Sequence, residues 1–346
     1  MFEDEQLSER KKEILLKSVE DYIQNALPIT SKAVQQCLSE NISTATLRNE
    51  LNALEAMGYL KQLHTSSGRV PTSKAYRLYV NGLLKDVKYN KDDLVTIKEN
   101  FCIKCNNINS IMENVAKTIS RVTNYPTVAV LNDLERLNIE DISIIPLIDY
   151  SALMLISTNG GVINNTIQIS ENTSKEDCVN CALWLKQKFV NTSIANLMEN
   201  IEKIVNDHNS QMAVYQEIFE GVIELFKELS SPKQNGKTKI LNLPEYSSVE
   251  KAKEIIDFLE DEEKVKSAVL EDEKLSISIG KENEDNELKD CAVIKAPIKV
   301  GNEIIGSVGV IGPQRLDYAF VAGAIKYVVD ELESKYKLDH NNKNKD

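Results

Sequence analysis

Residues 41–72 of the chain read NISTATLRNELNALEAMGYLKQLHTSSGRVPT, and this stretch decides the fold of the N-terminal part. Ser43 has a hydroxyl of the kind that caps helix starts, and Gly58 is typical of the position just after a helix end. Between them, three apolar residues recur at the three- and four-residue spacing of one helix face: Leu47, Leu51 and Leu54. The sequence therefore predicts an amphipathic helix that begins after Ser43 and ends near Gly58.

The opposite face of this helix is narrow and uncharged. At about 100° per residue, that face carries Ala45, Asn49, Asn52 and Ala56. Arg48 lies at its edge. A face that only meets solvent usually carries Lys and Glu, whereas an Asn amide can pair with an adenine edge and an Ala methyl can meet a thymine methyl. We therefore expect Asn49 and Asn52 to read bases in a DNA major groove, and Arg48 to contact guanine or phosphate.

A small hairpin is predicted directly after the helix. Residues 59–63 and 69–70 have the pattern of short strands, with a turn ending at Gly68 between them. Two more helices are expected upstream, over residues 8–24 and 31–38. Three helices followed by a hairpin form a winged helix-turn-helix, with the third helix as the recognition helix.

Other residues of this module are expected to contact the DNA backbone or the minor groove. A helix start offers hydroxyl and N–H groups to phosphates, and cationic side chains neutralise them. The candidates for these contacts are Ser31, Thr44, His64 and Arg69. The alternative is an ordinary helix–hairpin corner that has no nucleic-acid partner.

The charge distribution agrees with a DNA-binding N-terminus. The chain of 346 residues has a net charge of −12, which argues against a generally basic, nucleic-acid-coating protein. Residues 1–80 are neutral, and within them residues 41–80 carry a net charge of +3. A locally basic segment on an acidic body is typical of a DNA reader whose other domains have other tasks.

The apolar runs and the cysteines indicate where in the cell the protein is expected and whether it is expected to bind a metal. No apolar run approaches the roughly 18 residues of a membrane span, and the acidic start MFEDE is unlike a signal peptide. We therefore expect a cytoplasmic protein with reduced cysteines and no membrane partner. The pairs Cys102/Cys105 and Cys178/Cys181 could together hold zinc, but they are far apart, and the second pair shares a helix face with apolar residues. We expect no metal and no cofactor.

Three short motifs resemble the HrcA family of heat-inducible transcription repressors. The first is residues 42–72 followed by YRLYV at 76–80, the second is IGKEN at 279–283, and the third is GSVGVIGPQRLDY at 306–318. Together they extend the resemblance over nearly the whole chain. The sequence departs from the usual motifs by small or volume-conserving changes, with Ser67 in place of Ala, Ala75 in place of Gly and Leu316 in place of Met.

The C-terminal part predicts one α+β domain that carries an insertion. Strand-like runs at 128–131, 142–145, 152–156 and 162–169 precede a helical block at 174–229, and strand-like runs resume at 266–270, 275–279, 291–298 and 303–311. Residues 230–236 are expected to be a mobile loop.

The resemblance implies that this α+β domain is GAF-like and that its insertion is a dimerisation domain. The expected multidomain α+β protein then divides into a winged helix at 1–85, a linker with a helix at 86–106, a GAF-like domain at 107–171 and 241–335, a helical dimerisation domain at 172–240 and a disordered tail at 336–346.

These features predict a homodimeric, sequence-specific transcriptional repressor and not an enzyme. One recognition helix covers few base pairs, so a specific operator generally needs two half-sites and two subunits. The resemblance implies an inverted-repeat operator upstream of chaperone operons, and a GroEL-type chaperonin that keeps the repressor active. A regulator gated by a metabolite in the GAF-like pocket is the alternative. Catalysis has little support, because the chain has three histidines and no nucleophile motif.

Overall fold

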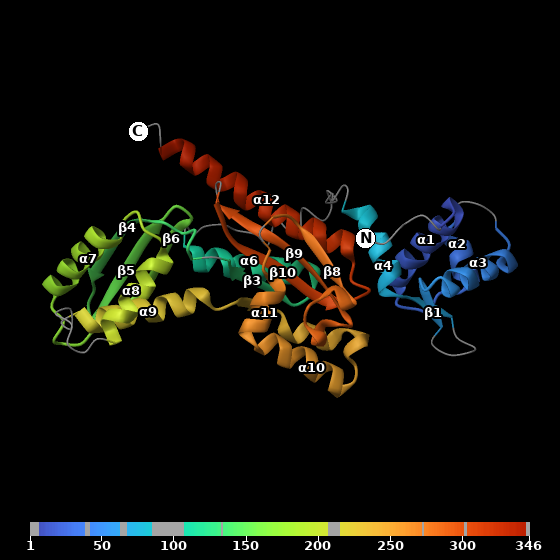
Figure 1. Ribbon diagram of the computed structural model, residues 1–346, viewed down its shortest axis with the longest axis horizontal. Coiled ribbons are helices and arrows are strands. Elements are labelled where there is room, and N and C mark those ends of the chain that lie inside the picture. Colours follow the sequence, from blue (N-terminus) through green and yellow to red (C-terminus); the bar gives the residue numbers. More distant parts are fainter. Residues whose placement is uncertain are drawn as a thin grey trace.

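Three domains follow one another along an elongated molecule in the computed structural model of the chain (Figure 1). The winged helix lies at one end, a domain with a five-stranded sheet lies in the middle, and a domain with a three-stranded sheet lies at the other end. The structure describes residues 7–38, 42–62, 68–84, 107–132, 134–206, 215–271, 273–300 and 303–343.

The N-terminal domain is the winged helix-turn-helix that its sequence predicts. Its elements are α1 (Glu9–Asn25), α2 (Ser31–Cys37), α3 (Thr44–Ala56), the hairpin strands β1 (Leu60–Gln62) and β2 (Arg69–Pro71), and α4 (Ser73–Leu83). Each of the first three helices begins after a residue whose side chain accepts a hydrogen bond from the first turn: Ser8, Thr30 and Ser43. Local caps therefore set the helix starts.

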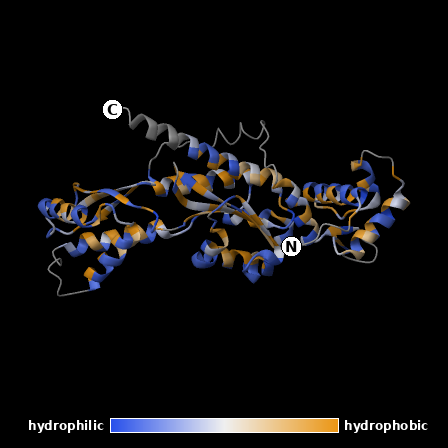
Figure 2. Ribbon diagram, turned by 45° about the horizontal axis from the view of Figure 1, so that its top comes forward, coloured by the Kyte–Doolittle hydropathy of each residue, from blue (hydrophilic) through white to orange (hydrophobic). Residues whose placement is uncertain are grey.

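The central domain is a five-stranded antiparallel sheet between two layers of helices. The strand order is β7 (Lys233–Asn235), β3 (Thr127–Leu131), β10 (Glu303–Pro313), β9 (Cys291–Val300) and β8 (Ser276–Ile279). One face packs against α6 (Ile108–Thr123) and α12 (Tyr318–Lys343), and the other against α10 (Val249–Glu260) and α11 (Glu262–Val269). Figure 2 shows hydrophobic and hydrophilic residues interleaved along the helices, as expected of amphipathic helices that cover a core.

The outer domain is a three-stranded antiparallel sheet with three helices. Its strands β4 (Ile139–Pro146), β5 (Ser151–Thr158) and β6 (Gly161–Gln168) pair in sequence order. The helices are α7 (Lys175–Phe189), α8 (Ile194–Asn206) and α9 (Gln216–Ser230). The turn between β5 and β6 consists of Asn159 and Gly160, a residue pair typical of two-residue hairpin turns.

The predicted position and composition of the insertion are wrong. Strands β4, β5 and β6 were expected in the first part of the central domain, residues 107–171, but they form a separate sheet with the helices of residues 175–230. The insertion therefore begins after β3, and it is a mixed α/β domain rather than a helical one. Alternating hydrophobicity predicts that a segment is a strand, but it does not specify the partner strand.

Three local predictions in the C-terminal part are also wrong. The expected mobile loop contains β7, a short polar edge strand paired with β3. Residues 266–269 are helical, because Asp261 caps α11 by accepting a hydrogen bond from the backbone N–H of Lys264 at 3.1 Å. Residues 336–343, assigned to a disordered tail, continue α12, since no Gly or Pro follows Leu332 to end the helix. The predicted linker at 86–106 lies outside the described residues.

Candidate DNA-binding face and the junction behind it

Helix α3 turns its leucines inward and its polar residues outward. Leu47, Leu51 and Leu54 are fully buried in the core of the winged helix. The side chains on the other side are exposed: Thr44, Ala45, Arg48, Asn49 and Asn52. The orientation predicted from the helical period is therefore confirmed, and five of the eight predicted site residues lie together on one exposed surface.

The remaining predicted residues have different surroundings. Ser31 is half-buried in the first turn of α2, and the cap of that helix is Thr30, whose Oγ1 accepts a hydrogen bond from the backbone N–H of Ala33 at 3.2 Å. His64 lies outside the described residues. Arg69 lies in β2, beside α3, and its side chain is only 14% exposed.

The side chain of Arg69 joins the hairpin to the recognition helix. Its Nε donates a hydrogen bond to Oε2 of Glu55 at 2.8 Å, and its Nη2 donates one to Oδ1 of Asn52. Arg69 was expected to contact phosphate, but here its guanidinium is already paired with two residues of α3. Because a guanidinium has donors only, the amide of Asn52 must present its oxygen to Arg69, which leaves Nδ2 as the group that can reach outward.

The backbone of Arg69 is held as firmly as its side chain. Its N–H donates to the carbonyl of Ile29 at 2.9 Å, and the N–H of Ile29 donates back at 2.7 Å. Gly68 makes this pairing feasible, because a Cβ at that position would lie 2.6 Å from the carbonyl oxygen of Ile29. The hairpin therefore places the Arg69 side chain against α3 with little freedom.

Ion pairs neutralise the two acidic residues of α3. Glu50 accepts from Arg10 at 2.6 Å and lies 3.6 Å from Lys11, both on α1. Glu55 is paired with Arg69. Arg48, on the same helix, is exposed. The surface around the recognition helix thus keeps a positive character that suits a polyanion.

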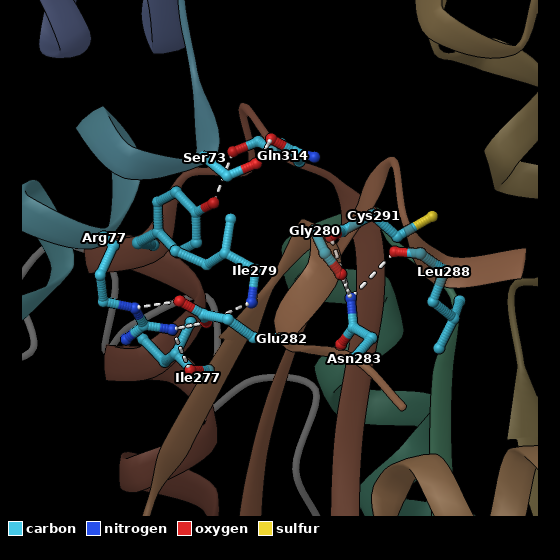
Figure 3. Close-up of polar contacts among 11 residues, drawn as sticks. Ser73, Arg77, Ile277, Ile279, Gly280, Glu282, Asn283, Leu288, Cys291 and Gln314 are labelled. Carbon is cyan, nitrogen blue, oxygen red and sulfur yellow. Dashed lines mark hydrogen bonds and ion pairs between the residues drawn. The ribbon is translucent and has the colours of Figure 1, made fainter. Parts of the chain in front are cut away.

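Behind the recognition helix, α4 is attached to the central domain by a bidentate ion pair. The guanidinium of Arg77 donates from Nε to Oε1 of Glu282 at 2.8 Å and from Nη2 to Oε2 of the same carboxylate. Nη2 also donates to the backbone carbonyl of Ile277 in β8 at 2.6 Å. Figure 3 shows these contacts converging from α4 and the edge of the central sheet.

A second polar contact and a ring cluster complete the junction. Ser73 Oγ and Gln314 Oε1 lie 2.9 Å apart (Figure 3). Gln314 Nε2 also donates to the carbonyl of Lys289 at 3.0 Å. The ring centroids of Tyr76 and Tyr318 are 6.0 Å apart, which is within the range of favourable aromatic pairs.

The tyrosines at the junction are packing residues. Tyr79 lies 6.5 Å from Tyr318 between ring centroids, and both Tyr76 and Tyr318 are almost fully buried. Burial raises the pKa of Tyr79 to about 12 and raises the pKa of the other two well above the ordinary value of 10.0. The three phenols therefore stay neutral at physiological pH.

Two open clefts flank the junction. One has a volume of about 400 Å³ and the other of about 630 Å³, and both include Lys61, Lys289 and Asp290 in their walls. Ligand pockets are usually lined by apolar and aromatic side chains with a few polar groups. The walls of these two clefts instead carry many charged side chains, and they are formed by residues of both the winged helix and the central domain.

Three of the four cysteines that the structure describes belong to hydrophobic cores, and the fourth, Cys37 at the end of α2, is exposed. Cys178 and Cys181 are fully buried on α7, and Cys291 is buried in β9. Among the described residues no group of three or more His, Cys, Asp or Glu is arranged to hold a metal ion. Cys102 and Cys105 lie outside that part of the chain. None of the described helices is long and apolar enough to cross a membrane.

Sequence reasoning missed the junction residues as functional candidates. Arg77, Glu282 and Gln314 lie within the three motifs quoted above, but no role was expected for them. Arg77 and Glu282 are 205 positions apart, and no local period or spacing relates residues at that distance. The signal that could have pointed to these residues was that the three motifs, although far apart in the chain, occur together in one sequence.

Two family models match the chain. The winged helix-turn-helix transcription repressor model, HrcA DNA-binding, matches residues 6–82, and the model of the HrcA protein C-terminal domain matches residues 109–321. Together they cover the winged helix and most of the remaining chain.

Curated relatives match over almost their full length. The heat-inducible transcription repressor HrcA of Acetivibrio thermocellus is 32% identical over 335 residues, which cover 94% of this chain and 95% of the relative. The protein of the same name from Clostridium tetani is 32% identical over 355 residues, covering 97% of each. That of Clostridioides difficile is 32% identical over 333 residues, covering 93% of this chain and 98% of the relative.

One solved structure shares the fold. A crystal structure at 2.2 Å resolution, described as a hypothetical protein, superposes with a TM-score of 0.74 at 21% identity. The match covers 96% of this chain and 99% of that one. At this identity the likeness establishes the arrangement of the chain and nothing about its partners.

Proposed function

Because this chain belongs to the HrcA family of heat-inducible transcription repressors, which is not a class of enzymes, we propose that it represses transcription by binding double-stranded operator DNA through α3 and the β1–β2 hairpin. The observation that carries the proposal is the exposed, uncharged face of α3 beside an exposed arginine. An α-helix with short side chains on its outer face fits the width of a major groove.

Each residue of this face has a proposed role. Asn49 and Asn52 read base edges, Ala45 meets a thymine methyl, and Arg48 reads guanine or holds phosphate. Backbone or minor-groove contacts are assigned to Thr44 at the start of α3, to Ser31 at the start of α2 and to His64.

Arg69 is given a different role from the phosphate contact that its sequence position suggested. Its ion pair with Glu55 and its hydrogen bond to Asn52 support a part in orienting the Asn52 amide. With Oδ1 held by Arg69, Asn52 donates from Nδ2 to base acceptors such as N7 of a purine. Binding to phosphate would instead require Arg69 to leave both partners.

A salt titration on two duplexes tests these roles. Asn52→Ala should weaken binding to the cognate operator by about 1–3 kcal/mol and leave binding to a scrambled duplex unchanged. If Arg69 acts by orienting Asn52, Arg69→Ala should also weaken only cognate binding, and the double variant should lose little more than Asn52→Ala alone.

The salt dependence separates the two roles of Arg69. A lost phosphate contact would lower the slope of log K against log salt by about one and weaken both duplexes. Lys17→Ala is the control, because Lys17 pairs with Glu20 within α1 and not with a residue of α3. Equal losses of Asn52→Ala on the two duplexes would exclude Asn52 as a base-reading residue.

We also propose that the repressor is a homodimer that binds an inverted repeat. Large apolar side chains are exposed on the outer domain: Ile145, Leu147, Ile148, Tyr150, Val179 and Leu183. Ile148 is 84% exposed, which is costly for an isoleucine that stays in water. A second copy covering this surface would present two recognition helices, as an operator of two half-sites requires.

The central domain is assigned to the GAF-like class, and a GroEL-type chaperonin is proposed as the partner that maintains the active fold. A five-stranded antiparallel sheet with helices on both faces supports the first assignment. For the second, the support is that β3 and β10 pair across about half of the chain, since slow non-local pairing leaves apolar surface exposed during folding.

A further inference from the structure

The three family motifs, which are far apart in sequence, meet at one place in the fold. The YRLYV motif contributes α4, the IGKEN motif contributes the end of β8 and the turn η4 (Gly280–Glu282), and the third motif contributes Gln314 and Tyr318. We propose that this junction positions the winged helix on the central domain, through Arg77, Glu282 and Gln314, so that a dimer accepts one separation of its half-sites. The proposal rests on the proposed dimeric repressor.

The ion pair at the junction fixes direction as well as distance. A guanidinium and a carboxylate joined by two parallel hydrogen bonds lie in one plane, unlike a pair joined by a single contact. The carboxylate of Glu282 is itself oriented, because its Oε2 accepts from the backbone N–H of Ile279 at 2.8 Å. The third contact, from Arg77 to the carbonyl of Ile277, removes the remaining freedom of the guanidinium.

The second half of the junction is a close approach at Gly280, where a Cβ would displace the side chains of Ser73 and Gln314. Gly280 has φ +60°, and a Cβ there would lie 2.6 Å from Ser73 Oγ and 2.8 Å from Gln314 Nε2. The turn is held from behind by Asn283, whose Nδ2 donates to the carbonyls of Gly280 at 3.0 Å and Leu288 at 2.9 Å. The surface that receives α4 is therefore rigid.

A short series of contacts carries this rigidity from α4 to the recognition helix. Thr72 Oγ1 donates to the carbonyl of Gly58 at 2.8 Å, directly after α3. Lys74 Nζ donates to the carbonyl of Met57 at 3.1 Å and lies 4.2 Å from the centre of the Tyr59 ring. Helix α4 thus contacts the end of α3 at one side and the central domain at the other.

Because DNA is helical, a winged helix that is fixed on the central domain restricts which separations of the two half-sites a dimer can bind. One added base pair between half-sites moves the second by about 3.4 Å and rotates it by roughly 34°. A dimer whose winged helices are fixed must distort itself or the DNA to follow that change. A dimer whose winged helices pivot at the junction follows it at little cost.

Fluorescence anisotropy titrations of the full chain provide the test. The probes are a single half-site duplex and inverted repeats whose central spacer is varied one base pair at a time. The wild-type chain should prefer one spacer, with about a tenfold loss of affinity when a base pair is added or removed. Arg77→Ala should keep the half-site affinity but bind neighbouring spacers nearly equally. Arg77→Lys should be intermediate, because an ammonium cannot form the two-pronged contact.

Two further variants separate the effect of the junction from the effect of simply removing a charge. Gly280→Ala should flatten the spacer preference by displacing the Ser73 and Gln314 side chains at the junction, without removing a charge. Lys264→Ala breaks a 2.9 Å ion pair with Glu287 inside the central domain and should leave the spacer profile unchanged.

Each other outcome has a definite meaning. An Arg77→Ala profile identical to the wild type, a wild type that tolerates all spacers, or a parallel loss of half-site affinity in Arg77→Ala would overturn the positioning role. A wild-type chain without preference for any inverted repeat would instead overturn the proposed dimeric operator binding.

Discussion

The two larger sheets of this molecule, in the central and the outer domain, are assembled in opposite ways. In the outer domain, β4, β5 and β6 pair in chain order through short turns. In the central domain, β3 lies beside β10, and Ser307 of β10 hydrogen-bonds Asn132 at the end of β3 across 175 positions. The central sheet can therefore close only after the whole insertion has been made.

The strands of the two sheets also differ in how deeply they are buried. Strand β10 is buried along nearly its whole length because helices cover both faces, whereas β5 alternates between buried and half-exposed residues. The comparison teaches that the central sheet depends on many simultaneous contacts and the outer sheet on a few local ones. In the central sheet, distant segments lose loop-closure entropy when they come together, before any stabilising contact between them has formed.

The largest expected effect is on the central sheet. A Cβ at Gly306 in β10 would lie 2.1 Å from Met112 Cε and 2.3 Å from the carbonyl oxygen of Val130, and the backbone of β3 cannot move aside. Gly306→Val should therefore lower the free energy of unfolding by about 3 kcal/mol or more. Thr166→Val, at an exposed position of β6, should change it by about 0.5 kcal/mol at most. Urea unfolding measures both, and equal effects would contradict the contrast between the sheets.

The next effect concerns the outer domain's exposed apolar surface. Replacing Ile148, which is 84% exposed, and Leu183, which is 58% exposed, by aspartate should prevent a second copy from covering them. We expect the dimer dissociation constant to rise by about 100-fold, equivalent to about 2.8 kcal/mol. Sedimentation equilibrium gives the constant. Leu241→Asp, at an exposed position of the central domain, is the control, and an unchanged constant in the double variant would place the dimer contact elsewhere.

Alkaline pH should weaken the central domain through a buried thiol. Burial raises the pKa of Cys291 to about 11 from the ordinary value of 9.0. Below pH 9 the Cys291 thiol is neutral in both the folded and the unfolded chain, so its contribution to the free energy of unfolding is complete. Between pH 9 and 11 only the unfolded chain loses the proton, so the free energy of unfolding should fall by up to about 1.4 kcal/mol per pH unit.

Cys291→Ser isolates this effect. A serine hydroxyl does not titrate in this range and keeps a polar partner for the Tyr246 hydroxyl, which lies 3.1 Å from Cys291 Sγ. Urea unfolding at pH 8, 9 and 10 should therefore show a shallower decline for the variant. A decline as steep as that of the wild type would assign the pH dependence to other groups.

The smallest expected effect is on refolding. If the non-local central sheet is the slow step, a GroEL-type chaperonin with ATP should raise the yield of DNA-binding protein from denaturant several-fold. Pulse-labelling hydrogen exchange should show protection of β5 and β6 before that of β3 and β10. A yield indifferent to chaperonin would favour direct heat sensing by the repressor.

Much of the candidate site could be predicted because its signals are local. The caps and the three- and four-residue spacing of the leucines determine which side of α3 faces outward, since both act within two helical turns. The same holds for the hairpin at Asn159 and Gly160. The role of Arg69 could not be predicted, because its contacts with Glu55 and Asn52 depend on how β2 packs against α3.

By itself, the sequence determined the winged helix, the exposed face of α3, the presence of most strands and the family to which the chain belongs. Only the tertiary structure decided which strands share a sheet, and that Arg77 of α4 meets Glu282 of the central domain. The physical reason is the distance along the chain over which each interaction acts. Helix caps, turns and hydrophobic periods act between near neighbours in the chain, whereas strand partners and domain junctions are selected by the packing of segments that meet only in the folded protein.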